Sequence, residues 1–213
     1  VLFYHLTNSP LEQTLPASFE DAAAIVEASL GPPLPDHEGV AMTRNDAAGL
    51  SGWVVWPLGE YVARHGQHHP ARGLQCLHAL TQRFSAEWAI RPFIVNHPEL
   101  CFNTLQQWTQ DGSAHVRRLV SEGSRPRLPW GLQLKSLIDD PTPTLPLLDV
   151  LQHDASPYVR RSVANHLNDI AKDHPELVRQ WLQRHLPGAS EPLRSLLKHA
   201  SRTLVKQGDR SVL

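Results

Sequence analysis

Charged and amide side chains recur at helical spacing on two segments of this chain. Arg118 and Glu122 stand four residues apart on the first segment, and Arg161, Asn165 and Asp169 follow the same interval on the second. Residues four apart share one face of a helix. We therefore expect carboxylates to lie among guanidinium groups on a polar surface that points away from the core. The simpler alternative is a set of surface ion pairs, each worth at most about 1 kcal/mol.

A second candidate site is the segment 124–130, which joins the two helices. Pro126 and Pro129 hold it extended, which would project Arg125 and Arg127 and place Trp130 at the head of the next helix. Guanidinium groups beside an exposed aromatic ring can grip phosphates and stack on a base. Alternatively, Trp130 fills the junction between two repeats.

A third candidate is the pair Glu87 and Trp88, where a carboxylate and an indole adjoin near a helix N-terminus. The helix dipole favours the charged carboxylate there. The plain alternative is that Glu87 only stabilises the start of the helix.

The elements that position these residues are repeated. Segment 108–118 returns as 151–161, 43 positions later, and a weaker echo follows at 190–194. This interval is typical of HEAT-like helical repeats, whose units bury their apolar faces against neighbouring units. We predict an all-α fold, a HEAT-like helical repeat solenoid that forms a curved α-α superhelix.

Apolar spacing and proline positions mark the expected helices. Ser18 is a candidate cap for the first helix, and a stripe of Val159, Val163, Leu167 and Ile170 defines the best-supported one. No segment shows sustained strand alternation. The predicted helices cover about 19–30, 53–66, 71–84, 86–92, one starting near 97, 114–123, 130–138, 143–152, 157–172, 175–186 and 191–206.

Composition narrows the class of protein. With 213 residues and 41% hydrophobic content, the chain suits a single repeat domain over 1–213, with an acidic helix and loop in 1–45 and repeats in 46–213. Cys76 and Cys101 have no metal or disulfide spacing, and no apolar run is long enough for a membrane span. The histidines of segment 65–69 lack a nearby carboxylate pattern, so we expect no metal and no cofactor. A cytoplasmic monomer follows, associated with the nucleoid if the source is prokaryotic.

Three longer motifs, in order, resemble one known family. The segments EWAIRPF (87–93), VRRLVSEGSRPRLPW (116–130) and YVRRSVANHLND (158–169) are similar to the signatures of the AlkC/AlkD DNA alkylation repair family, with the AlkC branch the closer match. Trp88 departs from the family pattern, which more often has Phe. The immunoglobulin-like C-terminal domain of some AlkC relatives is not expected in a chain that ends at Leu213.

The resemblance implies a monofunctional DNA glycosylase of base excision repair, a hydrolase that acts on cationic alkylated bases. The substrates would be double-stranded DNA with 3-methyladenine and also 3-methylcytosine. By the resemblance, the catalytic carboxylates are Asp169 and Glu87. The residue types suit this chemistry, because carboxylates can stabilise a sugar with oxocarbenium character. The residues expected around the lesion are Trp130, Trp88, Glu122 and Asn165. The residues expected on DNA phosphates are Arg117, Arg118, Arg125, Arg127, Arg160 and Arg161.

Two alternatives use the same repeats without chemistry. A HEAT-repeat scaffold would bind protein partners and release no base. A catalytically inactive DNA-binding relative would bind DNA in a salt-sensitive way and also release none.

Overall fold

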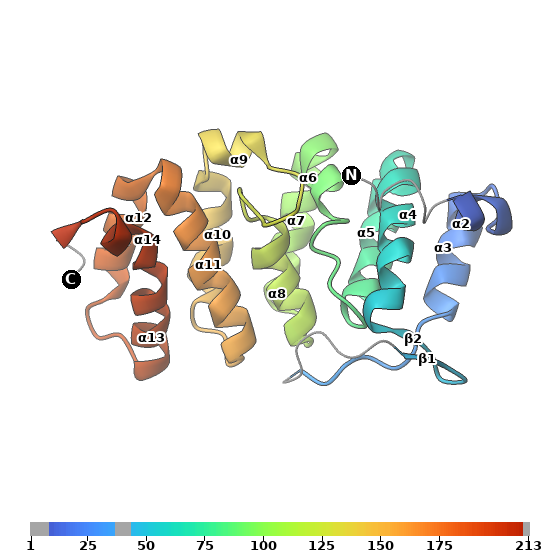
Figure 1. The fold of residues 1–213 in the computed structure, drawn as a ribbon, viewed down its shortest axis with the longest axis horizontal. Coiled ribbons are helices and arrows are strands. Elements are labelled where there is room, and N and C mark those ends of the chain that lie inside the picture. The colour runs from blue at the N-terminus through green and yellow to red at the C-terminus, as the bar shows by residue number, and fades with distance from the viewer. Residues whose placement is uncertain (1–8, 37–43, 211–213) are drawn as a thin grey trace. The chain divides into compact units, whose positions relative to one another are not determined.

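The computed structural model describes residues 9–36 and 44–210, and within these ranges the chain is mostly helical (Figure 1). The residues group into two compact units, Val1–Gln107 and Trp108–Leu213. The predicted all-α helical repeat fold is confirmed. Glu38, one of the acidic residues of the N-terminal segment, lies outside the described residues.

The first unit contains short helices and one small antiparallel hairpin. Its helix α3 is capped by Ser18, as predicted, since the Ser18 side chain accepts a hydrogen bond from the Asp21 amide. Helix α3 packs on α5 and α4, and α4 also packs on α6. The elements are α2 (Ser9–Thr14), α3 (Phe19–Ala28), β1 (Arg44–Asp46), β2 (Gly49–Ser51), η1 (Gly52–Val55), α4 (Trp56–His65), η2 (Gly66–His68), α5 (Pro70–Thr81), α6 (Arg91–Asn96) and α7 (Pro98–Trp108), whose last residue belongs to the second unit.

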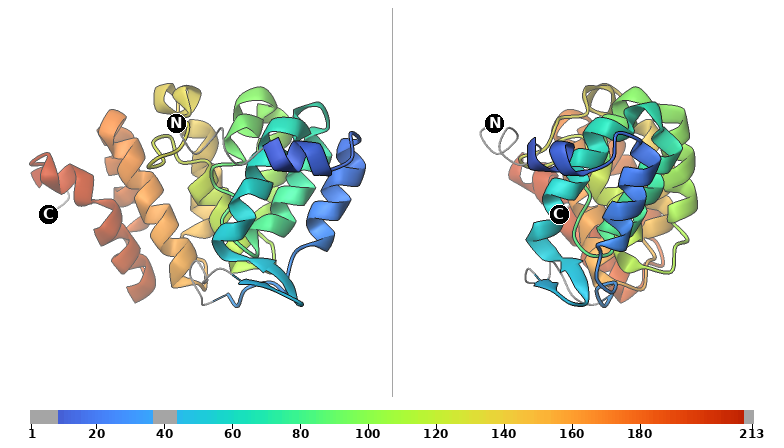
Figure 2. Two further views of the ribbon diagram at one scale, coloured as in Figure 1. Left: turned by 45° about the vertical axis from the view of Figure 1, so that its right-hand side comes forward. Right: turned by 90° about the vertical axis from the view of Figure 1, so that its right-hand side faces the viewer.

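In the second unit, α11 lies between α8 and α13, and α10 and α12 also pack against it. Figures 1 and 2 show α8, α11 and α13 running side by side. The predicted stripe is confirmed, because Val163 and its partners on α11 are buried. The elements are α8 (Ala114–Gly123), α9 (Lys135–Asp139), η3 (Thr142–Thr144), α10 (Leu145–Leu151), α11 (Pro157–Asp173), α12 (Pro175–His185), α13 (Glu191–Ala200) and α14 (Arg202–Lys206).

The repeated sequence forms the same local structure twice. Asp111 accepts a hydrogen bond from the Ser113 amide at 2.8 Å, and Asp154 accepts one from the Ser156 amide at 2.8 Å. Each aspartate thus forms a turn that leads the chain into its helix, α8 or α11. The repeat is therefore a structural motif that starts equivalent helices.

Three predicted helices were wrong in part. Residues 87–90 form turns, and α6 begins at Arg91, where that helix was expected to end. Residues 130–134 are not helical, since α9 starts only at Lys135. The helix predicted over 191–206 is divided at Ser201 into α13 and α14.

Candidate functional site

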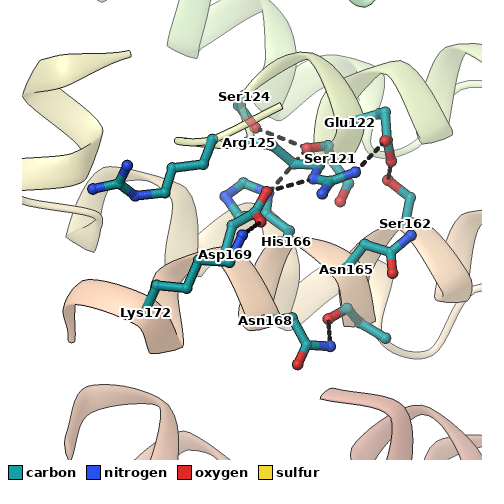
Figure 3. A network of polar contacts seen from close by, with 12 residues as sticks. Ser121, Glu122, Ser124, Arg125, Ser162, Asn165, His166, Asn168, Asp169 and Lys172 are labelled. Carbon is teal, nitrogen blue, oxygen red and sulfur yellow. Dashed lines mark hydrogen bonds and ion pairs between the residues drawn. The ribbon is translucent and has the colours of Figure 1, made fainter. Parts of the chain in front are cut away.

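Asp169 is the centre of a buried ionic network in the second unit (Figure 3). Its Oδ2 accepts a hydrogen bond from Arg125 Nε at 2.8 Å, and its Oδ1 accepts one from Lys172 Nζ at 2.8 Å. The residue is only 2% exposed. The expectation that Asp169 points away from the core was therefore wrong. The segment that follows α8 supplies Arg125, which covers the face of α11 that we expected to meet solvent.

Glu122, at the end of α8, extends this network. Its Oε1 accepts a hydrogen bond from Arg125 Nη1 at 2.5 Å, and its Oε2 accepts one from Ser162 Oγ at 2.5 Å. Burial alone would raise the pKa of Glu122, but the charges of Arg118 and Arg125 and the Ser162 hydrogen bond together lower it below its ordinary value. Glu122 is thus an anion at neutral pH, and it holds Arg125 from the side opposite Asp169.

His166, one turn before Asp169 on α11, packs beneath the network. Its Nδ1 lies 2.9 Å from the Ser121 carbonyl oxygen, which can only accept, so Nδ1 carries the proton. Its Nε2 is buried and has no hydrogen-bond partner among the described residues. Burial is the main cause that lowers the pKa of His166 to about 4, and the imidazole is therefore neutral at neutral pH. The sequence analysis did not single out this histidine.

The segment 124–134 is tied to α11 at two levels. Arg125 bonds Asp169, and Arg127 forms a two-pronged pair with Asp173, with Nε–Oδ2 and Nη2–Oδ1 distances of 2.7 and 2.8 Å. The backbone at residues 126, 127, 129 and 130 forms turns and is not extended as predicted, and Asp169 and Asp173 stand one helical turn apart. Both arginines thus point toward α11. The expectation that Arg125 projects from the surface was wrong, because its side chain is buried.

Trp130 lies in the same segment with an unusual backbone. Its φ of 63° places a non-glycine residue in the left-handed region, and the residue is 96% exposed. The expectation of a place at a helix start was wrong, and so was the alternative that the indole fills a junction between repeats. A strained backbone that holds a large apolar ring in solvent is a common feature of binding sites.

Arg117 connects two repeats, whereas Arg160 is bonded within its own repeat. Arg117 binds the Asp154 carboxylate through Nε and Nη2, at 2.6 and 3.1 Å, and also donates to the Asp111 carbonyl. Arg160 donates in the same way to the Asp154 carbonyl at 2.5 Å. We name the contact of Arg117 with Asp154 the repeat clamp. The donors of Arg117 are thus largely used inside the unit.

The other predicted polar residues occupy the same face of α8 and α11. Arg118 lies 4.8 Å above the ring of Tyr158, a cation–π contact, and 3.7 Å from Glu122. Asn165 accepts a hydrogen bond from His199 Nε2 at 3.0 Å. Arg161 is exposed and forms no ion pair or hydrogen bond through its side chain in the described part of the chain. It is therefore the predicted phosphate ligand that is most available to a partner.

Glu87 and Trp88 belong to the first unit, and each unit is described by itself. Glu87 is buried and accepts a hydrogen bond from Ser85 Oγ at 2.5 Å. Trp88 stacks on Trp56, with ring centroids 4.4 Å apart and an angle of 7° between the planes. Its Nε1 is buried without a hydrogen-bond partner within the described ranges. Phe84 extends the aromatic group, so the indole of Trp88 has a packing role in its own unit.

Two further features bear on the kind of site. No group of three or more His, Cys, Asp or Glu side chains in the described ranges is arranged to hold a metal ion. His65, one of the clustered histidines, instead lies 3.1 Å from Glu12. No helix in residues 9–36 and 44–210 is long and apolar enough to cross a membrane.

Comparisons with known proteins identify the relatives of this chain. Residues 83–204 match the family model described as "DNA alkylation repair enzyme". The protein YhaZ of Bacillus subtilis (strain 168), described as uncharacterized, is 45% identical over 169 residues, which cover 78% of this chain and 45% of that protein.

A solved structure is also similar. It is the Pseudomonas fluorescens alkylpurine DNA glycosylase AlkC bound to DNA that contains an abasic site analog, with 44% identity and a TM-score of 0.70. The match covers 76% of this chain and 45% of AlkC, so the chain spans about half the length of these relatives. The family model covers more than half of the chain and includes Glu87, the ionic network and Trp130. The chain belongs to the DNA alkylation repair enzyme family.

Proposed function

We propose that this chain is a DNA glycosylase that hydrolyses the N-glycosidic bond of cationic alkylated bases in double-stranded DNA, with 3-methyladenine and 3-methylcytosine as substrates. The observation that carries the proposal is the buried Asp169 carboxylate, which Arg125 holds in one orientation within a family of DNA alkylation repair enzymes. The similar AlkC is an alkylpurine DNA glycosylase and was solved with abasic-site DNA.

The proposed chemistry needs a charge of fixed position more than a proton donor. An alkylated base with a positive charge is already a good leaving group. What remains is to stabilise the sugar as it becomes cationic and to orient a water molecule, and a preorganised carboxylate serves both needs. Asp169 has this role in the proposal. Glu87 is the second proposed carboxylate.

Both oxygens of Asp169 are occupied in the free protein, but they are held unequally. The Arg125 side chain is 10% exposed and also bonds Glu122, whereas the Lys172 side chain is 49% exposed. A half-exposed ammonium can exchange its carboxylate for a DNA phosphate at little cost. We infer that DNA binding draws Lys172 away and leaves Oδ1 of Asp169 for the sugar, while Arg125 keeps Oδ2 in place.

The proposed lesion contact is Trp130, with Trp88, Glu122 and Asn165 as the other candidates. An indole in solvent can stack on a base and attracts a cationic base through its ring face. Trp88 is less suited to this task, because Trp56 already covers one face of its indole.

The proposed phosphate contacts are best supported at Arg161 and Lys172. Arg118 and Arg127 are partly exposed, with side-chain exposures of 16% and 31%. Arg117 and Arg160 are bonded inside the unit, and Arg125 is buried in the network. We expect these three arginines to stabilise the surface that binds DNA and not to contact DNA directly.

The test is to incubate the protein with double-stranded DNA methylated by an alkylating agent and to identify the free bases by chromatography. Release of 3-methyladenine supports the proposal, and strand breaks that appear only after alkali treatment support a monofunctional enzyme. DNA binding without any base release would favour the inactive relative. Neither binding nor release would favour the protein scaffold.

A further inference from the structure

The second unit also has a groove near its C-terminal end, and apolar side chains line part of it. Its apolar lining consists of Leu182 and Leu197, which are buried, and of Leu186 and Val205, which are 57% and 40% exposed. The groove lies between α12 on one side and α13 and α14 on the other, and it is partly open, with a volume of about 680 Å³. We name it the C-terminal groove. Two large apolar side chains that remain this exposed indicate a surface for a partner.

Four cations line one border of the C-terminal groove, and no carboxylate is among its lining residues. All four are exposed, and none has a side-chain ion pair or hydrogen bond within the described residues. These cations are Arg194, Lys198, Arg202 and Lys206.

The four cations form two pairs, Arg194 and Lys198 on α13 and Arg202 and Lys206 on α14, and Ser201 divides the two helices. The Ser201 amide donates to the Leu197 carbonyl at 3.0 Å, and the Val205 amide donates to the Ser201 carbonyl at 2.9 Å. Between these two bonds the helical pattern is interrupted, because the Thr203 amide donates instead to Asn168 Oδ1 at 2.9 Å and the His199 carbonyl accepts a hydrogen bond from Asn168 Nδ2 at 2.8 Å. Within each helix the two cations are four residues apart, so they share one face at a spacing of about 6 Å.

We propose that the C-terminal groove binds an amphipathic helix of another protein, with acidic residues four apart along one edge of its apolar stripe. Such a helix presents carboxylates at the same interval of about 6 Å, and its apolar stripe covers Leu186 and Val205. The complementary charges set the orientation of the helix in the groove. DNA fits the cations but not the apolar walls, because a phosphate backbone offers no apolar surface in return.

The test uses a fluorescein-labelled synthetic helix of about 20 residues, long enough to reach both pairs of cations. It carries leucines on one stripe and glutamates four residues apart beside it, and its binding to the whole chain is followed by fluorescence anisotropy. Charge reversal of two cations in the variant K198E/R202E should weaken binding about tenfold, since it turns several weak attractions into repulsions. Leu186→Asp should weaken binding independently of the charges.

The matched control is Lys135→Glu, which reverses an exposed cation on α9 away from the C-terminal groove. It should bind the helix like the wild type, and circular dichroism should show the same folding for all variants. A helix with lysines in place of the glutamates should not bind.

Three results would overturn the proposal. The first is equal affinity of the acidic helix for the wild type and for K198E/R202E. The second is displacement of the helix by duplex DNA together with weaker DNA binding by K198E/R202E, which would assign the C-terminal groove to DNA. The third is a wild-type protein that is dimeric in sedimentation equilibrium while K198E/R202E is monomeric, which would assign the C-terminal groove to a second copy of this chain.

Discussion

Replacing Asp169 by asparagine should separate its catalytic role from its structural one. The change keeps the shape of the side chain but removes the charge that Arg125 and Lys172 share. The bond to buried Arg125 weakens from a charge-assisted to a neutral hydrogen bond, at about 1 to 2 kcal/mol. The loss of the half-exposed Lys172 pair adds at most about 1 kcal/mol. We expect the free energy of unfolding to fall by about 2 kcal/mol, which leaves a typical domain folded.

The same substitution should slow base release far more than it destabilises the fold. Loss of a preorganised charge opposite a forming cation costs about 3 kcal/mol of transition-state stabilisation, which slows release about a hundredfold or more. The assay is single-turnover release of 3-methyladenine, at a temperature where circular dichroism shows each variant to be folded. Glu87→Gln is measured on the same DNA and should also slow release.

Asp173→Asn is the matched control. It removes the same charge one turn further along α11 and also breaks an ion pair, that of Arg127, but this pair is outside the buried network. Release by Asp173→Asn should stay within about threefold of the wild type. Equal rates for Asp169→Asn and Asp173→Asn would refute the assignment of Asp169, whatever their stabilities.

The remaining predictions concern the indole, acid and salt. Trp130→Gly should stabilise the protein by about 1 kcal/mol in thermal unfolding, because glycine adopts the positive φ without strain. The same variant should show a lower preference for charged lesions. A lower melting temperature than that of the wild type would contradict the strain at Trp130. The pKa of His166 is about 4 in the folded chain against an ordinary 6.5, so the unfolded chain binds the proton at a higher pH than the folded chain does. The free energy of unfolding should therefore be highest above pH 6.5 and should fall by about 3 kcal/mol toward pH 4. The lowered pKa of Glu122 should reduce the free energy of unfolding further below pH 4.5. Denaturant titrations at several pH values measure this, and a flat profile would exclude a buried neutral His166. Arg161→Gln should reduce the slope of log affinity against log salt for DNA by about one unit, whereas Lys135→Gln should leave it unchanged.

The repeat pattern predicted the helices of the second unit because it rests on local rules. The apolar stripe through Val163 is buried as expected, and the helix starts after Asp111 and Asp154 follow from turn chemistry within a few residues. Such features depend on spacing alone. They therefore appear in the sequence.

The buried network could not be predicted in the same way. Arg125 and Asp169 are 44 residues apart, and their contact depends on how segment 124–134 folds over α11. The helical pattern assigns every position opposite the apolar stripe to solvent, which is wrong where a neighbouring segment covers that face. The sequence does predict the contact of Lys172 with Asp169, because a lysine three residues after an aspartate on a helix lies beside it.

Trp130 illustrates another limit. The prolines of its segment specify extended backbone, and nothing in residue types predicts a left-handed tryptophan. Segment 124–134 is closed into a loop by backbone hydrogen bonds, including that of the Leu134 amide to the Pro126 carbonyl at 3.1 Å, and this loop fixes the conformation of Trp130. Tertiary context sets such a backbone.

Within the described residues the repeat clamp has no counterpart at the next junction, where the Asn168 side chain instead donates to the His199 carbonyl and accepts from the Thr203 amide. Arg117 reaches the carboxylate of Asp154, but the residue at the corresponding place of the third repeat is Gly188, and Arg160 bonds backbone carbonyls instead. In stacked repeats each junction contributes its own coupling energy. Opening fluctuations should therefore begin at α13 and α14 and spread inward, and the amides of these helices should exchange with deuterium before those of α11. The junction beside the C-terminal groove is thus held without an ion pair of the clamp type, and ordering of α13 and α14 by a partner there would add to stability.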